Sequence, residues 1–324
     1  MLDCAADDRR GVTRVRGVRI TGDGVRVVDA GADSTGGVRV SVVSAGICGS
    51  DLHLVSFGPS PFTLGHEFCG RLDDGTPVAV LPVVHCGTCD RCRAGAEHQC
   101  PSALGAMYGI SRHGGMADEV WVDPSCAKAL PADLPLEHAC LVEPLAVALH
   151  GLHRAGVEPG VRTLVIGGGP IGLCTVAAAR AGGAEVDLVA RHPGRMDAGE
   201  RLGATMTAGQ DYDIVLDAAG TQSSLDEAVN RVRPGGTVAT LSNFWQPVSL
   251  TMQFQVKEVS LVPAFTYGHH RGVPEFEEAA RVLARTPDLP GALITHHFGL
   301  DDAAEAFAVA GDRSTGAIKV VLHP

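Results

Sequence analysis

One stretch of twenty residues brings together side chains that could bind a metal ion and move a proton. Residues 48–67 read CGSDLHLVSFGPSPFTLGHE, and their donor side chains are Cys48, Ser50, His53, His66 and Glu67. Thiolate, imidazole and carboxylate suit zinc, and a catalytic zinc site usually takes three protein ligands and keeps one position open. By itself, the stretch fits a buried cysteine and a core histidine equally well.

A second group of potential ligands follows at Cys86, Cys89, Cys92 and Cys100. The spacing C-x2-C-x2-C-x7-C lets neighbouring thiolates converge on one ion, and four thiolates complete a tetrahedral structural zinc site. Glycines and charged residues lie between the cysteines, so the segment has no apolar face that would bury four free thiols. An iron–sulfur cluster uses similar spacing and is favoured only by Pro101 after the last cysteine. We expect a structural zinc.

Residues 167–172, GGGPIG, contain the pattern G-x-G-x-x-G at Gly167, Gly169 and Gly172. They follow the strand-like run TLVI and open the helix-like run LCTVAAARAG. Glycines permit the tight turn and the close approach of a pyrophosphate, and the helix N-terminus presents free N–H groups to it. We therefore expect a dinucleotide to contact the three glycines, Pro170 and Ile171.

The end of the next strand predicts which dinucleotide binds. NAD-binding proteins usually place Asp or Glu there to hold the ribose 2′-hydroxyl. Here EVDLV runs into Ala190 and is followed by Arg191, His192 and Arg195, whereas Asp187 comes too early, within the strand. The guanidinium of an arginine can bind a 2′-phosphate through two parallel hydrogen bonds. Alternatively, both arginines are simply solvent-exposed residues of the loop. We predict NADP(H) in preference to NAD(H).

The hydrophobic pattern predicts the elements that position these groups. Val-rich runs at 15–20, 25–28 and 38–43, with another strand at 77–84, indicate an antiparallel β domain. The stretch 48–67 is then expected on a loop leaving a strand. From residue 161 strands alternate with helices, which predicts a parallel sheet with crossover helices. A helical segment within 131–157 joins the two parts, and two amphipathic helices and two strands are expected after residue 267.

Composition restricts the class of protein. The chain has 324 residues, of which 45% are apolar, and is long enough for about two domains. A formal net charge of −11 argues against nucleic acid or an anionic membrane surface as partner. No apolar run approaches the ~20 residues of a membrane span, and the N-terminal residues lack the pattern of a secretory signal. The clustered cysteines favour metal binding in a reducing compartment, so we expect a cytoplasmic protein.

The order of five motifs resembles that of the zinc-dependent medium-chain alcohol and polyol dehydrogenases over essentially the whole chain. The motifs are CGSDLH, LGHEFCG, the four-cysteine segment, VEPLAV and GGGPIG. The resemblance implies an α/β protein with a GroES-like, β-rich catalytic domain and a Rossmann domain built on a doubly wound parallel sheet. We expect the catalytic domain at 1–145 with 267–324 and the Rossmann domain at 146–266, with the active site in the cleft between them.

The resemblance also implies roles for individual residues. A catalytic zinc would be held by Cys48, His66 and a carboxylate from Glu67 or Glu143, and which glutamate ligates can change with the catalytic state. An acidic residue at 143 is similar to the threonine and sorbitol dehydrogenase branch, whereas another branch has a cysteine there. Glu143 could instead be only a charge at a helix N-terminus.

The mechanism implied by the resemblance uses zinc as a Lewis acid while a hydride passes between substrate and nicotinamide. Ser50 would take the alcohol proton, and a relay through the cofactor ribose would end at His53. Lys319 matches a basic position that approaches the pyrophosphate. An ordinary surface imidazole and an edge-strand lysine are the alternative interpretations of His53 and Lys319.

These expectations combine into one predicted function and two alternatives. We predict a zinc-dependent oxidoreductase that transfers a hydride between NADP(H) and a secondary alcohol or polyol, or its ketone or aldehyde. It would bind two zinc ions per chain, act on a small molecule and form a homodimer or homotetramer. The alternatives are a zinc-type reductase of an activated C=C or C=N bond, which would tend to lack Ser50 and His53, and a non-catalytic NADP(H)-binding protein, which would be expected to lack metal ligands.

Overall fold

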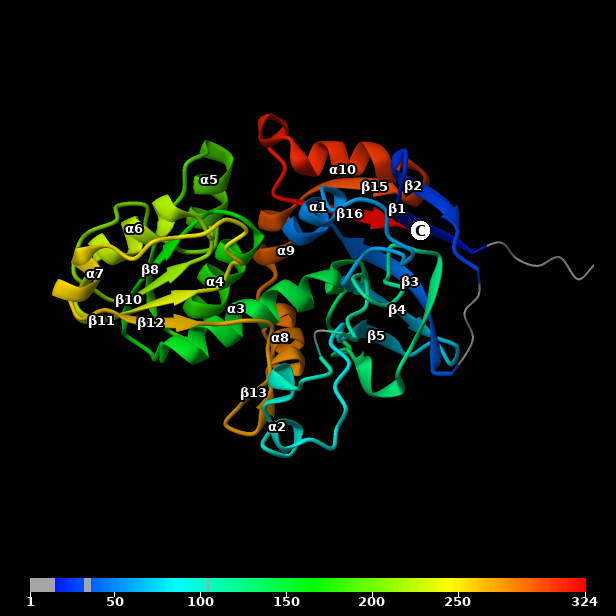
Figure 1. The fold of residues 1–324 in the computed structure, drawn as a ribbon, viewed down its shortest axis with the longest axis horizontal. Coiled ribbons are helices and arrows are strands. Elements are labelled where there is room, and N and C mark those ends of the chain that lie inside the picture. Colours follow the sequence, from blue (N-terminus) through cyan, green and yellow to red (C-terminus); the bar gives the residue numbers. More distant parts are fainter. Residues whose placement is uncertain (1–14, 32–35, 104) are drawn as a thin grey trace, which may run out of the picture.

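Two β-sheets of different character organise the chain, and a group of helices fills the seam between them (Figure 1). The computed structural model describes residues 15–31, 36–103 and 105–324. One sheet has seven strands and is mostly antiparallel, whereas the other has five strands that are all parallel. The predicted α/β class, with a β-rich domain beside a Rossmann-type domain, is confirmed.

The seven-stranded sheet joins both ends of the chain. Its order is β15-β16-β3-β4-β5-β7, with β6 also paired to β3, and only the β15–β16 pair is parallel. The register sets Leu322 opposite Ala45, so the C-terminus lies beside the strand that leads to Cys48. The strands are β3 (Val38–Gly46), β4 (Glu67–Leu72), β5 (Pro77–Val80), β6 (Glu119–Val122), β7 (Ala127–Ala129), β15 (Ile294–Gly299) and β16 (Lys319–His323).

One face of this sheet is covered by a hairpin and a helix. The hairpin consists of β1 (Arg16–Thr21) and β2 (Gly24–Asp29), and the helix is α10 (Ala303–Gly311). Apolar side chains from these elements and from the sheet form a common core, because alternate residues of a strand point to the same face. Val18, Val40, Phe68 and Phe307 belong to this core.

The parallel sheet has the order β12-β11-β10-β8-β9. Its central strands, β8 and β10, are mostly buried apolar runs, as expected where crossover helices pack on a parallel sheet, whereas the edge strand β12 is largely exposed. The strands are β8 (Arg162–Ile166), β9 (Glu185–Val189), β10 (Tyr212–Asp217), β11 (Val232–Thr240) and β12 (Ser260–Pro263). The intervening helices are α4 (Pro170–Ala181), α5 (Pro193–Arg201), α6 (Gln222–Arg231) and α7 (Met252–Val256).

The seam contains α3 (Val142–Ala155), α8 (Glu275–Ala284) and α9 (Asp288–Leu293). Helix α3 packs against α4 and α8, and α9 packs against α4 and α5. The sequence pattern did not predict α9. Because α8 and α9 contact helices of the parallel sheet, the domain boundary expected at 267 stays a prediction.

The expectation of a loop after β3 is wrong in part, because the chain forms helix α1 (Gly49–Val55) there. The loop was expected because the stretch directly follows a strand; the helix is short, and its first turn carries Gly49 and Ser50. The backbone N–H of Cys48 donates to the Asp51 carboxylate at 2.9 Å, which satisfies one of the free groups at the helix start.

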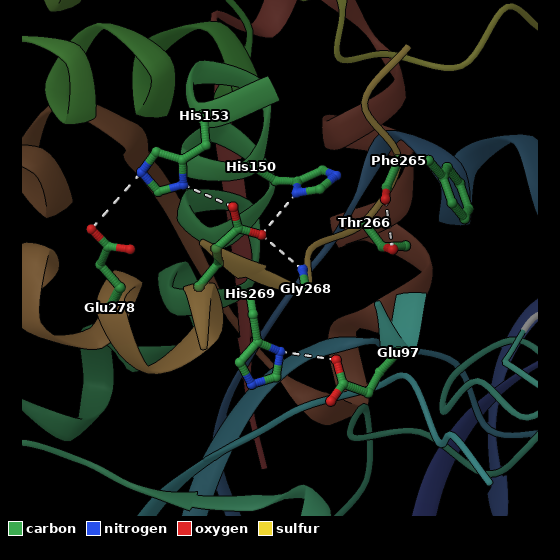
Figure 2. Close-up of polar contacts among 9 residues, drawn as sticks. Glu97, His150, His153, Phe265, Thr266, Gly268, His269 and Glu278 are labelled. Carbon is green, nitrogen blue, oxygen red and sulfur yellow. Dashed lines mark hydrogen bonds and ion pairs between the residues drawn. The ribbon is translucent and has the colours of Figure 1, made fainter. Parts of the chain in front are cut away.

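A cluster of histidines and glutamates connects the four-cysteine segment to the seam (Figure 2). The Nδ1 atoms of His150 and His153 on α3 each lie 2.8 Å from a carboxylate oxygen of Glu275, the first residue of α8. Nearby, His269 of the short hairpin β13 (His269–His270) and β14 (Val273–Pro274) pairs with Glu97 at 2.9 Å. Glu97 begins a short 3-10 helix that follows α2 (Asp90–Arg93).

Among the helices of the described residues, none is long and apolar enough to cross a membrane.

Candidate active site

Helix α1 carries Ser50 and His53, the two residues predicted to move the proton, on one of its faces. Ser50 and His53 are three residues apart on this helix, so their side chains lie on the same face. Asp51 points the other way, is completely buried and holds the N–H of Cys48. The helix therefore carries a thiol at its N-cap and a hydroxyl and an imidazole on the adjoining face.

The start of β4 brings His66 and Glu67 to the same place. Glu67 pairs with Gly46 in the sheet, and a Cβ on residue 46 would lie 2.3 Å from a Glu67 carboxylate oxygen. Glycine at 46 thus makes room for the glutamate. The ligand atoms of Cys48, His66 and Glu67 all lie within 4.8 Å of one another.

The surroundings of His66 fit a metal ligand. Its Nδ1 lies 3.4 Å from Asp51 Oδ1, and its Nε2 lies 3.3 Å from the hydroxyl of Ser50. A metal-binding histidine commonly faces a carboxylate with one ring nitrogen and leaves the other for the ion. Burial opposes protonation, but the charges of Asp51 and Cys48 outweigh it and raise the pKa of His66 well above its usual value. The residues therefore provide a favourable place for a cation, and the donor set of thiol, imidazole and carboxylate fits zinc.

The two predicted carboxylates have different partners. The Nζ of Lys319 lies 2.8 and 2.5 Å from the two carboxylate oxygens of Glu67, and it also donates to the Ile47 carbonyl at 3.1 Å. Glu143, in the first turn of α3, accepts a hydrogen bond from the Tyr267 hydroxyl at 3.2 Å. Burial raises the pKa of Glu143 to about 7. Glu67 is thus paired with a cation, whereas Glu143 is buried with a neutral donor.

The four cysteines of the second cluster converge. The sulfur atoms of Cys86, Cys89, Cys92 and Cys100 lie within 4.8 Å of one another. Backbone N–H groups point at these sulfurs: that of Cys89 at Cys86 Sγ (3.3 Å), and that of Cys92 at Cys89 Sγ (3.5 Å). Hydrogen bonding from the Thr88 backbone lowers the pKa of Cys86 to about 6, so its thiolate form is favoured. The geometry fits one tetrahedral ion.

The glycine-rich turn lies at the carboxyl end of β8, where nucleotides bind in open parallel sheets. Gly167 has φ of 111°, a conformation that side chains disfavour. A Cβ at Gly172 would collide with the Gly167 carbonyl oxygen, so glycine is required for this tight turn. Pro170 and Ile171 begin helix α4, whose N-terminus faces the turn.

The residues predicted to bind a 2′-phosphate follow strand β9. Arg191 and His192 are exposed, and the guanidinium of Arg191 lies 3.1 Å from the Ser223 hydroxyl. Arg195 in α5 donates to the Ala317 carbonyl at 3.3 Å and is half-buried. Asp187 lies inside β9 and accepts a hydrogen bond from the Tyr212 hydroxyl.

Comparison with known proteins identifies the family. Residues 34–132 match the family described as alcohol dehydrogenase GroES-like domain, and residues 170–285 match the zinc-binding dehydrogenase family. The chain is 30% identical to L-galactonate-5-dehydrogenase of Escherichia coli (strain K12), over 83% of this chain and 86% of that protein. It is 32% identical to L-arabinitol 4-dehydrogenase of Aureobasidium melanogenum, over 89% and 87%. The chain belongs to the zinc-dependent medium-chain dehydrogenases.

A solved structure agrees with this assignment. The dehydrogenase superposes with a TM-score of 0.82 on a structure described as a zinc-binding dehydrogenase from Sinorhizobium meliloti 1021 bound to NADP. The two chains are 28% identical, and the match covers 96% of this chain and 100% of the other. This dehydrogenase is therefore an enzyme of the alcohol and polyol type, as its motifs predicted.

Several contacts between distant residues of the dehydrogenase could not be predicted from the sequence. Lys319 was expected near the pyrophosphate, but its ammonium is buried against Glu67, 252 residues away. Tyr267 reaches Glu143 across 124 residues. Trp245 stacks on His53 with ring centroids 4.1 Å apart. No local motif links these pairs, so only the folded chain reveals them.

Proposed function

We propose that this dehydrogenase oxidises a secondary alcohol or polyol, or reduces the corresponding carbonyl compound, using NADP(H) and two zinc ions per chain. The observation that carries the proposal is the convergence of Cys48, His66 and Glu67 beside the hydroxyl of Ser50. Three ligands of these types leave a fourth position open for substrate, as a catalytic zinc requires. The four-cysteine cluster would hold the second zinc in a closed, structural site.

Glu67 is the proposed third ligand, because its carboxylate lies within reach of the Cys48 thiol and the His66 ring. Lys319 occupies part of its hydrogen-bonding capacity, but a carboxylate has about four acceptor positions and can bind an ion as well. Glu143 is the alternative ligand. A nearby cation would offset the burial that raises its pKa.

Zinc, when bound, supplies Lewis-acid chemistry that lowers the pKa of an alcohol or polarises a carbonyl, and the nicotinamide supplies the hydride chemistry. The chain's own groups would hold and move the proton. Ser50 is positioned to accept it, since its hydroxyl lies at the metal-binding group. His53, one turn along α1 and exposed, would pass it to solvent. Buried Asp51 would keep His66 oriented.

The preference for NADP(H) rests on the end of β9. Ala190 is small and neutral, Arg191 and His192 are exposed beside it, and Asp187 is engaged by Tyr212. This cationic edge suits a 2′-phosphate, and residues 190–195 offer no carboxylate for a ribose hydroxyl. The similarity to a dehydrogenase solved with NADP supports this choice.

The substrate class rests on the polar groups of the site and on the relatives. The Ser50 hydroxyl beside His66 and the buried Glu143–Tyr267 pair give this region a polar character. The two relatives named above are dehydrogenases of a sugar acid and of an alditol. A polyhydroxylated substrate is therefore favoured over a simple aliphatic alcohol. The intact Ser50 and His53 pair disfavours reduction of C=C or C=N bonds.

A homo-oligomer is also proposed. Strand β12 is one edge of the parallel sheet, and it carries or is followed by the exposed apolar residues Leu261 and Phe265. An open edge with apolar neighbours favours pairing with a second copy. Sedimentation at several concentrations tests this, and a monomer at all of them contradicts it.

The test of the function is a panel of polyols, sugar acids and simple alcohols with NADP+ and NAD+, followed by nicotinamide absorbance. Cys48→Ala and His66→Ala should abolish turnover while the protein stays folded. Cys126→Ala, a buried cysteine outside both metal groups of the described residues, is the matched control and should keep it. Full activity of Cys48→Ala or His66→Ala would exclude the metal mechanism.

A further inference from the structure

Trp245 lies on a segment that leaves the nucleotide-binding edge of the parallel sheet. The segment 241–251 follows the carboxyl end of β11, and its backbone packs at Gly220, where a Cβ would lie 2.7 Å from the Asn243 carbonyl oxygen. Gly167, in the dinucleotide turn, in turn packs against Ala218 and Ala219. One continuous row of contacts therefore runs from the dinucleotide turn to the start of this segment.

The indole of Trp245 crosses from this edge to helix α1. It stacks on the imidazole of His53 with centroids 4.1 Å apart and planes inclined by 19°. The ring of Phe57, just after α1, lies 6.2 Å from the same indole. His53 shares its helix face with Ser50, whose hydroxyl is 3.3 Å from His66. Trp245 thus contacts a residue that lies one helical turn from Ser50, which borders the proposed metal-binding group.

The stack is not part of a hydrophobic core. Trp245 is 39% exposed and Phe57 is 71% exposed, so both rings lie at the surface and outside the buried clusters. In the described part of the chain, the His53 ring has no hydrogen bond, so stacking is the contact that orients it. An aromatic pair contributes about 0.5–1.5 kcal/mol. That is enough to select one rotamer of an exposed histidine.

We propose that Trp245 is a positioning residue for proton transfer, which holds the imidazole of His53 on the Ser50 side of α1. The proposal rests on the relay role of His53 given above. Because the indole comes from the nucleotide-binding side and the imidazole from the catalytic side, the relay is complete only when the two sides stand in this arrangement. Trp245 thereby couples the arrangement of the two sheets to proton release.

The kinetic test compares Trp245→Ala, Trp245→Phe and His53→Ala with wild type under saturating NADP+. Trp245→Ala should lower kcat at least about fivefold, part of the roughly 100-fold or more that acid–base transfer contributes. The KM for the alcohol should change by less than about twofold, since substrate binding is not altered. Trp245→Phe should recover most of kcat because a ring is restored. Leu250→Ala, an exposed apolar residue of the same segment, is the control and should match wild type.

A spectroscopic test does not depend on turnover. The chain has two tryptophans, so Trp121→Phe leaves Trp245 as the one reporter. Adding His53→Ala should change its emission, because water then replaces the imidazole that stacks on the indole. An unchanged emission would show that the stack does not form in solution and overturns the proposal.

The outcomes separate this proposal from the proposed function. If His53→Ala loses activity while Trp245→Ala keeps full kcat, the positioning role is wrong and the relay stands. If Trp245→Ala lowers only the thermal midpoint, the residue is structural and the proposal fails. If His53→Ala is fully active, the relay itself is wrong, and the role of Trp245 falls with it.

Discussion

Lys319 and Glu67 form an ion pair in which both side chains are about 1% exposed. The lysine begins the last strand, β16, and the glutamate begins β4, so the pair joins the C-terminal end of the chain to the candidate metal centre. Burial opposes the charged ammonium, but the charges of Glu67 and Cys48 outweigh it and raise the pKa of Lys319. A pair of this kind depends on both partners, because either charge left alone would be buried without compensation.

Replacing Lys319 should destabilise the protein much more than replacing a lysine whose ion pair is open to solvent. Lys319→Met leaves Glu67 unpaired, and the free energy of unfolding in urea should fall by about 3–5 kcal/mol. Lys128→Met is the matched control: this partly exposed lysine pairs with the partly exposed Glu277 at 3.6 Å, and a pair open to solvent is worth about 1 kcal/mol or less. Equal losses in both variants would mean that the buried pair does not stabilise the fold.

Substituting a ligand in either proposed zinc site should remove only the zinc bound at that site. His66→Ala removes one ligand of the group on α1 and β4, so the purified variant should keep one zinc per chain and lose catalysis. Cys92→Ser should lose the other zinc and lower the thermal midpoint, because a closed thiolate site contributes folding energy. Elemental analysis measures both. Finding the full wild-type zinc content in His66→Ala would contradict the proposed catalytic site.

The choice between the two glutamates follows from the same measurement. Glu67→Gln should lose the catalytic zinc if Glu67 is the resting ligand, because an amide binds zinc far less well than a carboxylate. Glu143→Gln should then keep the metal and change only turnover. The reverse pattern would assign the ligand to Glu143. His296→Ala, a half-buried histidine of β15 outside both groups of converging ligands, controls for general effects of substitution on metal content.

Glu275 should stabilise the helices of the seam at neutral pH, and this contribution to stability should be lost in acid. Burial tends to raise the pKa of this carboxyl, but the hydrogen bonds with His150 and His153 outweigh it and hold the pKa well below the usual 4.5. A carboxyl with a lowered pKa stabilises the fold above its unfolded pKa, and this contribution is lost as pH falls below about 4.5. Glu275→Gln should therefore be less stable than wild type at pH 7, and the gap should narrow in acid.

Thermal midpoints between pH 3 and pH 8 measure that gap. Glu278→Gln is the control, since this glutamate is partly exposed and lies 4.0 Å from His153. A gap between Glu275→Gln and wild type that stays constant with pH would contradict the assigned linkage.

Cofactor choice should depend on Arg191. Arg191→Ala should raise the KM for NADP+ roughly tenfold or more, the cost of losing a charge-assisted contact, and leave that for NAD+ unchanged. Arg281→Ala, exposed on α8, removes the same charge elsewhere and should alter neither. Wild-type enzyme that uses NAD+ better than NADP+ would refute the predicted preference.

The chemistry and the general architecture of this dehydrogenase could be predicted from its sequence, because the signals are local. Cysteines three residues apart, a glycine turn between a strand and a helix, and the periodicity of apolar residues all lie within short windows. The four converging cysteines and the parallel sheet after residue 161 are examples. Helix α1 was missed because it is short and directly follows a strand, where a loop was expected.

Only the tertiary structure decided which distant side chains meet. Lys319 contacts Glu67, Tyr267 contacts Glu143, and Trp245 stacks on His53, each across more than a hundred residues of chain. Such pairs follow from strand order and helix packing, which place side chains without leaving any periodic trace in the sequence. The sequence by itself therefore determined which groups could bind metal and nucleotide. The fold determined which of these groups are buried, paired or held in place.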